Sequence, residues 1–137
     1  MNWIVAGIIG GVVAYLADFV MWSKVFTKGM DQYFTPPPGG APVAMGPRLA
    51  KSAVLSLVYG VLFTYLYVQF KGSLWVQGGG PLAGMEFASV LWLPTIALST
   101  VGSGVWFDKV RPLLKATFWS WFVRMNVAGL VIGLLIK

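Results

Sequence analysis

The chain has 137 residues, enough for a single domain. Hydrophobic residues make up 58% of it and charged residues 10%, against roughly 45–50% and about 25% in soluble domains. These proportions exclude a soluble globular protein and predict an integral membrane protein. The formal net charge of +6 comes mostly from basic residues in two predicted loops, a pattern typical of cytoplasmic loops, so it does not indicate nucleic-acid binding.

Cysteine and histidine are both absent from the sequence. Their absence excludes disulfides, thiol chemistry, cysteine or histidine metal sites, and histidine as a haem ligand or general base. Nothing else in the sequence indicates a pigment or another prosthetic group. We therefore predict neither a cofactor nor a metal site.

The first predicted span covers residues 2–23, and Trp3 and Trp22 near its two ends suit the membrane interfaces. It has neither a basic start nor a small-residue cleavage site, so we predict a retained helix rather than a signal peptide. Residues at steps of three or four share one face of a helix, and small residues there let a neighbouring helix approach closely. Here that face holds Gly7, Gly11, Ala14 and Asp18.

A long loop over residues 24–48 leads to the second predicted span, over residues 49–70. The loop contains the proline-rich segment 35–42, which favours an extended path and serves as a connector or, alternatively, a docking site for a partner. Small and hydroxyl residues recur at every fourth position of the span and predict another helix-packing face. They are Ser52, Ser56, Gly60 and Thr64.

The third predicted span, over residues 84–107, is interrupted by Pro94. Proline removes a backbone hydrogen bond and kinks a helix, which frees a carbonyl group. Thr95 and Ser99 follow on one face with Gly102, and such hydroxyls often satisfy freed backbone groups in membrane helices. We therefore predict a proline kink satisfied by these side chains, with a ligand contact as the alternative.

A short basic loop over residues 108–112 leads to the fourth predicted span, over residues 113–136. One face of this span carries Thr117, Ser120, Arg124 and Ala128. A roughly opposite face carries Asn126, Gly129 and Gly133. A helix with small or polar residues on two faces favours protein on both sides, so the second face predicts contact with an oligomer or a larger assembly.

The distribution of basic residues predicts the topology. Cytoplasmic loops of membrane proteins are rich in lysine and arginine. Loops 24–48 and 108–112, with the positions just after them, carry seven of these residues, whereas the second loop carries only Lys71. We therefore expect both basic loops in the cytoplasm and both termini outside. The basic residues are Lys24, Lys28, Arg48, Lys51, Lys109, Arg111 and Lys115.

Arg124 is a costly residue deep inside a span, and such a residue needs a partner or an aqueous path. Asp18 is the only acidic side chain well inside another predicted span. At 1.5 Å per residue, Asp18 lies roughly 7–8 Å and Arg124 roughly 15 Å from the cytoplasmic helix ends, and the two side chains lean toward each other. We predict an ion pair that sets helix register or, alternatively, lines a polar cavity for protons or anionic substrates. Otherwise Arg124 reaches lipid headgroups or another chain.

Three stretches carry a family resemblance: Met1-Asn-Trp-Ile4, Trp22-Ser-Lys-Val-Phe-Thr-Lys-Gly-Met30, and the segment from Trp106-Phe-Asp-Lys-Val-Arg-Pro to Gly133. In these the chain resembles small bacterial membrane proteins catalogued as domain of unknown function 1761. The resemblance implies four spans in a bacterial inner membrane. Lys24 stands where that family often has proline, and the proline-rich loop is not typical of it. No catalytic residue follows, since that family has no established activity.

The sequence thus predicts an all-α protein, a polytopic transmembrane bundle of four helices in which residues 1–137 form one domain. No nucleophile–base pair or metal-ligand cluster is recognisable, so we predict no enzymatic activity. The first functional hypothesis is an accessory or scaffolding subunit that packs against partner membrane helices in the bilayer. The alternative is a small oligomeric transporter that uses a buried polar site at Asp18 and Arg124.

Overall fold

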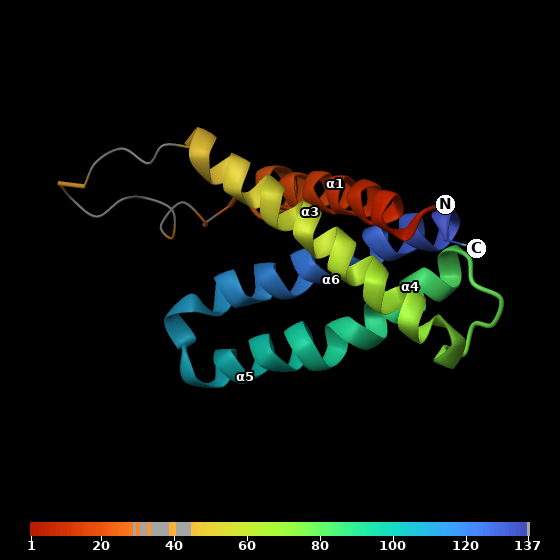
Figure 1. Ribbon diagram of the computed structural model, residues 1–137. Coiled ribbons are helices and arrows are strands. Elements are labelled where there is room, and N and C mark those ends of the chain that lie inside the picture. Colours follow the sequence, from red (N-terminus) through yellow and green to blue (C-terminus); the bar gives the residue numbers. More distant parts are fainter. Residues whose placement is uncertain (29, 31–32, 34–38, 41–44, 137) are drawn as a thin grey trace.

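The computed structural model describes residues 1–28, 30, 33, 39–40 and 45–136, so most of the proline-rich segment 35–42 lies outside the described residues. The described elements are all helical, which confirms the all-α prediction (Figure 1). In chain order they are α1 (Trp3–Val20), the π-helical turn η1 (Met21–Val25), α3 (Met45–Phe70), the 3₁₀ turn η2 (Lys71–Ser73), α4 (Pro81–Trp92), the π-helical turn η3 (Leu93–Ala97), α5 (Leu98–Trp106), the 3₁₀ turn η4 (Asp108–Val110) and α6 (Arg111–Leu135).

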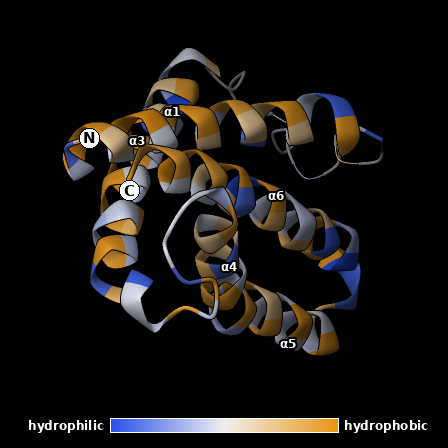
Figure 2. Cartoon of the chain, turned by 90° about the vertical axis from the view of Figure 1, so that its right-hand side faces the viewer, coloured by the Kyte–Doolittle hydropathy of each residue, from blue (hydrophilic) through white to orange (hydrophobic). Residues whose placement is uncertain are grey.

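Four continuous helical segments are long and apolar enough to cross a membrane: Trp3–Val25, Met45–Ser73, Pro81–Trp106 and Asp108–Leu135. This places the chain in the class of integral membrane proteins. Hydrophobic residues make up much of each of these helices (Figure 2). Their outward-facing side chains are exposed in the isolated chain, as expected of a surface that lipid covers.

Several helix ends differ from the predicted spans. α3 begins at Met45, so Arg48 and Lys51 lie in its first two turns rather than in or beside a loop. The third segment begins at Pro81, three residues before the predicted start, because Gly78, Gly79 and Gly80 all adopt positive φ angles and Pro81 opens the helix. The missing N–H of proline costs nothing in the first helical turn. A hydropathy profile detects neither the glycine turn nor the proline at the helix start.

The helices form two ends with different character (Figure 1). The N- and C-termini lie at one end together with the connection from α3 to α4, and we call this the terminal end. At the opposite end lie the end of α1, the start of α3 and the turn from α5 to α6. We call it the basic end, because the described elements there carry Lys24, Arg48, Lys51, Lys109, Arg111 and Lys115.

Glycines bring α1 and α3 into close contact. A Cβ atom added at Gly7 would lie 2.7 Å from the Cα of Val61, and one added at Gly11 would lie 2.5 Å from the carbonyl oxygen of Ser56. Gly60 faces the backbone of Gly7 and Gly11 from the other helix. Only glycine permits this approach, and close backbone packing is a main source of helix association in lipid.

A second glycine contact joins α4 and α6. A Cβ atom at Gly84 would collide with the backbone of Gly129, and the reverse also holds. Gly133 meets the backbone of Gly80 and Pro81 in the same way. The face of α6 that the sequence analysis assigned to an oligomer or a larger assembly is therefore occupied by α4 of the same chain. The sequence marked the face as tightly packed but could not say which helix covers it.

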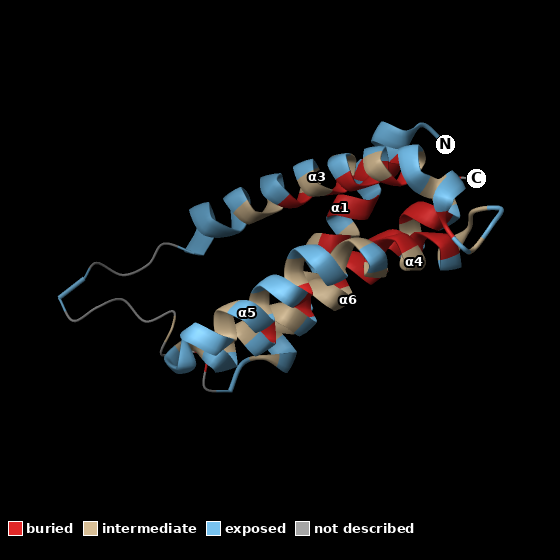
Figure 3. Cartoon of the chain, turned by 90° about the horizontal axis from the view of Figure 1, so that it is seen from below, coloured by how far each residue is buried: buried red, intermediate tan, exposed pale blue. Residues whose placement is uncertain are grey.

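Aromatic side chains complete the core in the terminal half. The rings of Phe63 and Phe87 lie 5.1 Å apart, and Tyr67 also contacts Phe87 at 5.7 Å, so these contacts link α3 to α4. Buried residues gather in this half, whereas α5 and the start of α3 are largely exposed (Figure 3). α5 contains no buried residue. The bundle is thus tight at the terminal end and open at the basic end.

Candidate functional site

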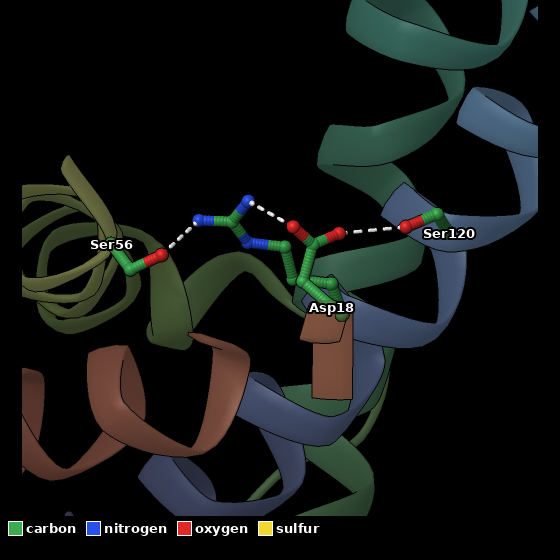
Figure 4. Close-up of polar contacts among 4 residues, drawn as sticks. Asp18, Ser56 and Ser120 are labelled. Carbon is green, nitrogen blue, oxygen red and sulfur yellow. Dashed lines mark hydrogen bonds and ion pairs between the residues drawn. The ribbon is translucent and has the colours of Figure 1, made fainter. Parts of the chain in front are cut away.

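Asp18 and Arg124 meet inside the bundle, where α1 lies against α6. Nη1 of Arg124 lies 3.6 Å from Oδ2 of Asp18. Nη2 of Arg124 donates a 2.6 Å hydrogen bond to Oγ of Ser56 on α3, and Ser120 Oγ donates a 2.7 Å bond to Oδ1 of Asp18. Figure 4 shows the chain of contacts from Ser56 to Ser120. We call these four residues the polar network; it joins α1, α3 and α6.

Two aromatic rings also hold the guanidinium group of Arg124. Its Cζ atom lies 4.5 Å from the ring centroid of Trp121 and 5.0 Å from that of Tyr59. Cation–π contacts of this kind gain strength where water is excluded. Nε of Arg124 and the hydroxyl of Tyr59 are nevertheless buried without a hydrogen-bond partner among the described residues. The network therefore keeps unmet hydrogen-bonding capacity at its inner end.

The two charged partners differ in access. The Arg124 side chain is 9% exposed and the Asp18 side chain 21% exposed. The difference arises because Asp18 borders a hollow at the basic end, whereas Arg124 lies deeper between the helices. A partly exposed carboxylate can exchange partners with a ligand or with water more easily than the buried guanidinium can.

The hollow at the basic end has a volume of about 660 Å³ and is bordered by α1, η1, the residues just after η1, α3 and α6. This volume lies within the roughly 300–1,000 Å³ typical of small-molecule sites. We call it the Asp18 hollow. Its lining residues are Tyr15, Asp18, Phe19, Trp22, Ser23, Phe26, Thr27, Met30, Met45, Arg48, Leu49, Ser52, Leu113 and Thr117.

A row of polar side chains leads from the lining of the hollow to the polar network. On α3, Arg48 and Ser52 line the hollow one turn apart, and Ser56 follows one turn later as the partner of Arg124. On α6, Thr117 lines the hollow one turn before Ser120. Ser52 thus belongs to the hollow, while Ser56 and Gly60 form the helix contact. Sequence reasoning missed Arg48 as a site residue, although its spacing of four from Ser52 was a usable signal.

The other residues predicted for helix packing occupy both halves of the bundle. Ala14 is fully buried on α1. Asn126 accepts a 3.1 Å hydrogen bond from Ser89 on α4 through Oδ1, and its amide donates to the carbonyl of Phe122. Thr64 donates a 2.8 Å bond to the carbonyl of Gly60 within α3. These polar side chains are thus satisfied inside the chain.

The Pro94 region differs in detail from the prediction. Pro94 lies in the π-helical turn η3, and Thr95 donates a 2.6 Å hydrogen bond to the carbonyl of Leu91. Ser99 is exposed and takes no part; Thr100 instead donates to the carbonyls of Ile96 and Ala97. The wider π turn rotates the residues that follow it relative to a regular α-helix, so a spacing argument fails beyond the turn.

Glu86 is a structural anchor that the sequence analysis did not identify. Its two carboxylate oxygens accept 2.7 Å hydrogen bonds from the backbone N–H groups of Trp75 and Val76. The carboxylate therefore holds the connection between α3 and α4 against the start of α4. The available signal was an acidic residue in the second turn of a helix that follows a glycine-rich turn.

The arrangement can bind a polar group and compensate charge inside the bundle. Within the described part of the chain, no group of three or more acidic, histidine or cysteine side chains could hold a metal ion. The polar network offers one carboxylate, one guanidinium and two hydroxyls. Such a set can bind a polar group or relay a change of charge between helices.

No family model, curated protein or solved structure matches this chain. The resemblance to domain of unknown function 1761 stays a prediction that rests on the short stretches quoted above.

Proposed function

We propose that the chain is a non-enzymatic protein of a bacterial inner membrane that works as a small oligomeric transporter, with Asp18 and Arg124 at the inner end of its solute path. One observation carries the proposal: the Asp18 hollow lies at the basic end, and Asp18 in its lining pairs with Arg124, which lies deeper between the helices. Beyond the pair, glycine contacts and aromatic rings close the terminal half. A cavity in one half of a bundle whose other half is closely packed suits one state of an alternating-access cycle.

The same geometry gives less support to the hypothesis of an accessory subunit. That hypothesis relied on the face with Asn126, Gly129 and Gly133, which packs against α4 in the same chain. A purely structural ion pair also needs no polar row leading to it from the basic end. Arg48, Ser52 and Thr117 form such a row, and all three line the hollow.

Accessibility labelling tests the proposal, and the chain is well suited to it because it contains no cysteine. In membrane vesicles of known orientation, we expect Ser52→Cys to react with a membrane-impermeant maleimide from the basic end. Leu55→Cys is the matched control, since Leu55 lies three residues further along α3 with 67% exposure toward lipid. A thiol in lipid stays protonated and unreactive. Equal labelling of the two variants would sink the idea of an aqueous hollow.

The transport step needs a second position in the closed half. Thr64 is fully buried beyond the polar network, so Thr64→Cys reports whether the terminal half ever opens. An alternating-access transporter predicts slow labelling of this variant from the terminal end and faster labelling when the basic end is blocked. Complete protection of Thr64→Cys, with Ser52→Cys still reactive, would show a cavity that never opens to the terminal end and would contradict transport.

A specific observation keeps the accessory role as a second candidate. Leu98, Val101 and Val105 of α5 are 63%, 58% and 66% exposed, and α5 buries no residue within the chain. A partner helix could cover this face more closely than lipid does. Purification in a mild detergent from native membranes separates the candidates. A stable complex with a different polypeptide supports the accessory role, and a homo-oligomer supports the transporter.

A further inference from the structure

The Asp18 hollow combines an apolar wall with a single charge that has no partner among the described residues. Most of its lining is aromatic or aliphatic, including Tyr15, Phe19, Trp22 and Phe26 on the side of α1 and η1. Arg48 also lines the hollow, from the first turn of α3; it is exposed and makes no ion pair or hydrogen bond within the described part of the chain. A ligand of this hollow therefore meets a cation beside an apolar surface.

Asp18, the acidic residue in the lining, does not make the hollow favourable for a cation. Asp18 is already compensated by Arg124 and accepts the hydroxyl hydrogen of Ser120. A cationic ligand would have to displace Arg124, which is 9% exposed and would lose its only acidic partner in the described structure. It would also approach past Arg48 and the other basic residues of that end. An anionic group meets no such opposition and gains a charge-assisted hydrogen bond from the guanidinium of Arg48.

We propose that the Asp18 hollow binds a single-chain anionic amphiphile drawn from the membrane leaflet at the basic end, with its anionic headgroup on Arg48. The inference rests on the proposed function and names the substrate class of the same site. Ser52, one turn after Arg48, is placed to hydrogen-bond the headgroup, and the apolar chain lies along Phe19, Trp22 and Phe26. The volume of about 660 Å³ suits one chain with a small headgroup.

Binding of a dansyl-labelled undecanoic acid to the full chain in a neutral detergent tests this inference. The fluorescence of the probe rises when it leaves water, and Trp22 provides an energy donor within the hollow. We expect Arg48→Gln to weaken binding on the order of tenfold, the size expected for a hydrogen bond to a charged group. Arg48→Lys should restore part of the affinity, because it keeps the charge and loses the planar fork.

Lys51→Gln is the matched control. Lys51 is exposed one turn from Arg48 on the same helix but does not line the hollow. Its effect on binding should be smaller than that of Arg48, because Lys51 is exposed to solvent and does not line the hollow, so it is not placed to hydrogen-bond the headgroup. Ser52→Trp fills the hollow and should abolish binding of the acid without removing a charge. Equal losses from Lys51→Gln and Arg48→Gln would overturn the inference in favour of diffuse surface attraction.

The charge of the ligand is tested with a dansyl-labelled long-chain amine of matched length. The inference predicts that the amine binds more weakly than the acid and that its binding is insensitive to Arg48→Gln. Tighter binding of the amine would overturn the inference.

The outcomes of the labelling and binding experiments distinguish the transporter proposal from the proposed substrate class. If Ser52→Cys is labelled from the basic end, Thr64→Cys is labelled from the terminal end and the acid does not bind, the substrate class is wrong and the transporter proposal stands. If the acid binds through Arg48 while Thr64→Cys stays protected, the site stands and transport fails.

Discussion

At the scale of single residues, the unequal burial of Asp18 and Arg124 decides how each responds to substitution. Arg124 is 9% exposed and is fixed by Ser56, Asp18 and two aromatic rings. Asp18 is 21% exposed, borders the hollow and keeps Ser120 as a donor. Removing one partner of a buried pair is costly mainly because the other charge remains buried. The deeper charge is therefore the more costly one to leave alone.

We expect Asp18→Asn to destabilise the fold by about 1–3 kcal/mol, the range for a buried polar group left unsatisfied. Arg124→Gln should cost less, because the remaining carboxylate can be hydrated from the hollow. Unfolding in mixed detergent measures both variants. Lys115→Gln is the control, since Lys115 is exposed on the same helix as Arg124.

The double variant Asp18→Asn with Arg124→Gln tests whether the two residues act as a pair. A coupled pair predicts that the double variant is no less stable than Asp18→Asn alone, since neither buried charge remains. Strictly additive losses would contradict a functional interaction across the 3.6 Å contact.

Glu86 gives a second prediction at this scale. Glu86→Ala removes the acceptor for the N–H groups of Trp75 and Val76, so these amides should exchange with deuterium faster than in the unchanged chain. Glu86→Gln should fall between the two, because a carboxamide has one acceptor oxygen instead of two. Hydrogen exchange by mass spectrometry on the segment from Lys71 to Gly80 measures the effect. Unchanged exchange in Glu86→Ala would show that the loop is held by other contacts.

At the scale of the helices, two glycine contacts define which helices pair closely. Gly7, Gly11 and Gly60 join α1 to α3, and Gly84 with Gly129 joins α4 to α6. The hydrophobic effect contributes little to helix association inside a bilayer, because lipid tails are as apolar as the side chains. The close backbone contact and the van der Waals packing it allows therefore supply much of the stability. An added methyl group at these positions should therefore separate the helices.

We expect Gly129→Ala to destabilise the fold by about 1–3 kcal/mol, the cost of overpacking a tight contact. Gly102→Ala is the matched control on α5, where an added Cβ would meet nothing within 4 Å. That change should be neutral or slightly stabilising, because alanine favours a helix over glycine by roughly 1 kcal/mol. Thermal unfolding in detergent compares the two variants, and equal stability would refute the close α4–α6 contact.

At the scale of the whole molecule, the ends of the bundle differ in charge and in packing. Six described basic residues lie in the elements of the basic end, and Lys71 lies in η2 at the terminal end. The terminal half is closed by the buried residues of the core, while the basic half contains the Asp18 hollow. If the positive-inside rule holds, the hollow opens toward the cytoplasm.

Reporter fusions at the C-terminus test this orientation. In bacterial cells, we expect alkaline phosphatase fused after Lys137 to be active and a green fluorescent protein fused there to be dark, since both termini are expected outside. Fusions in the segment between α5 and α6 should give the reverse pattern. A fluorescent C-terminal fusion would invert the topology and place the hollow on the outer face.

The number and type of the elements could be read from hydropathy, because each span must satisfy its own backbone hydrogen bonds in lipid. Asp18 and Arg124 could be proposed as a pair because few charged residues lie deep in the spans. Hydropathy did not predict that α3 begins at Met45, because the charged residues in its first two turns lower the local hydropathy although the helix has already begun. It also did not predict that α4 begins at Pro81, because the glycine-rich turn before it lowers the local hydropathy. The π-helical turn at Pro94 also broke the periodicity used to place Ser99.

The sequence by itself thus determined the membrane class, the all-α fold and which helix faces are small or polar, because these properties are local and periodic along the chain. Only the tertiary structure decided what lies opposite each face. It assigned Gly129 and Gly133 to α4 within the chain, gave Arg124 its partner Ser56, and left the basic half open around Asp18. A small or polar face specifies that something packs closely there, but the identity of the neighbour depends on how all the helices fit together.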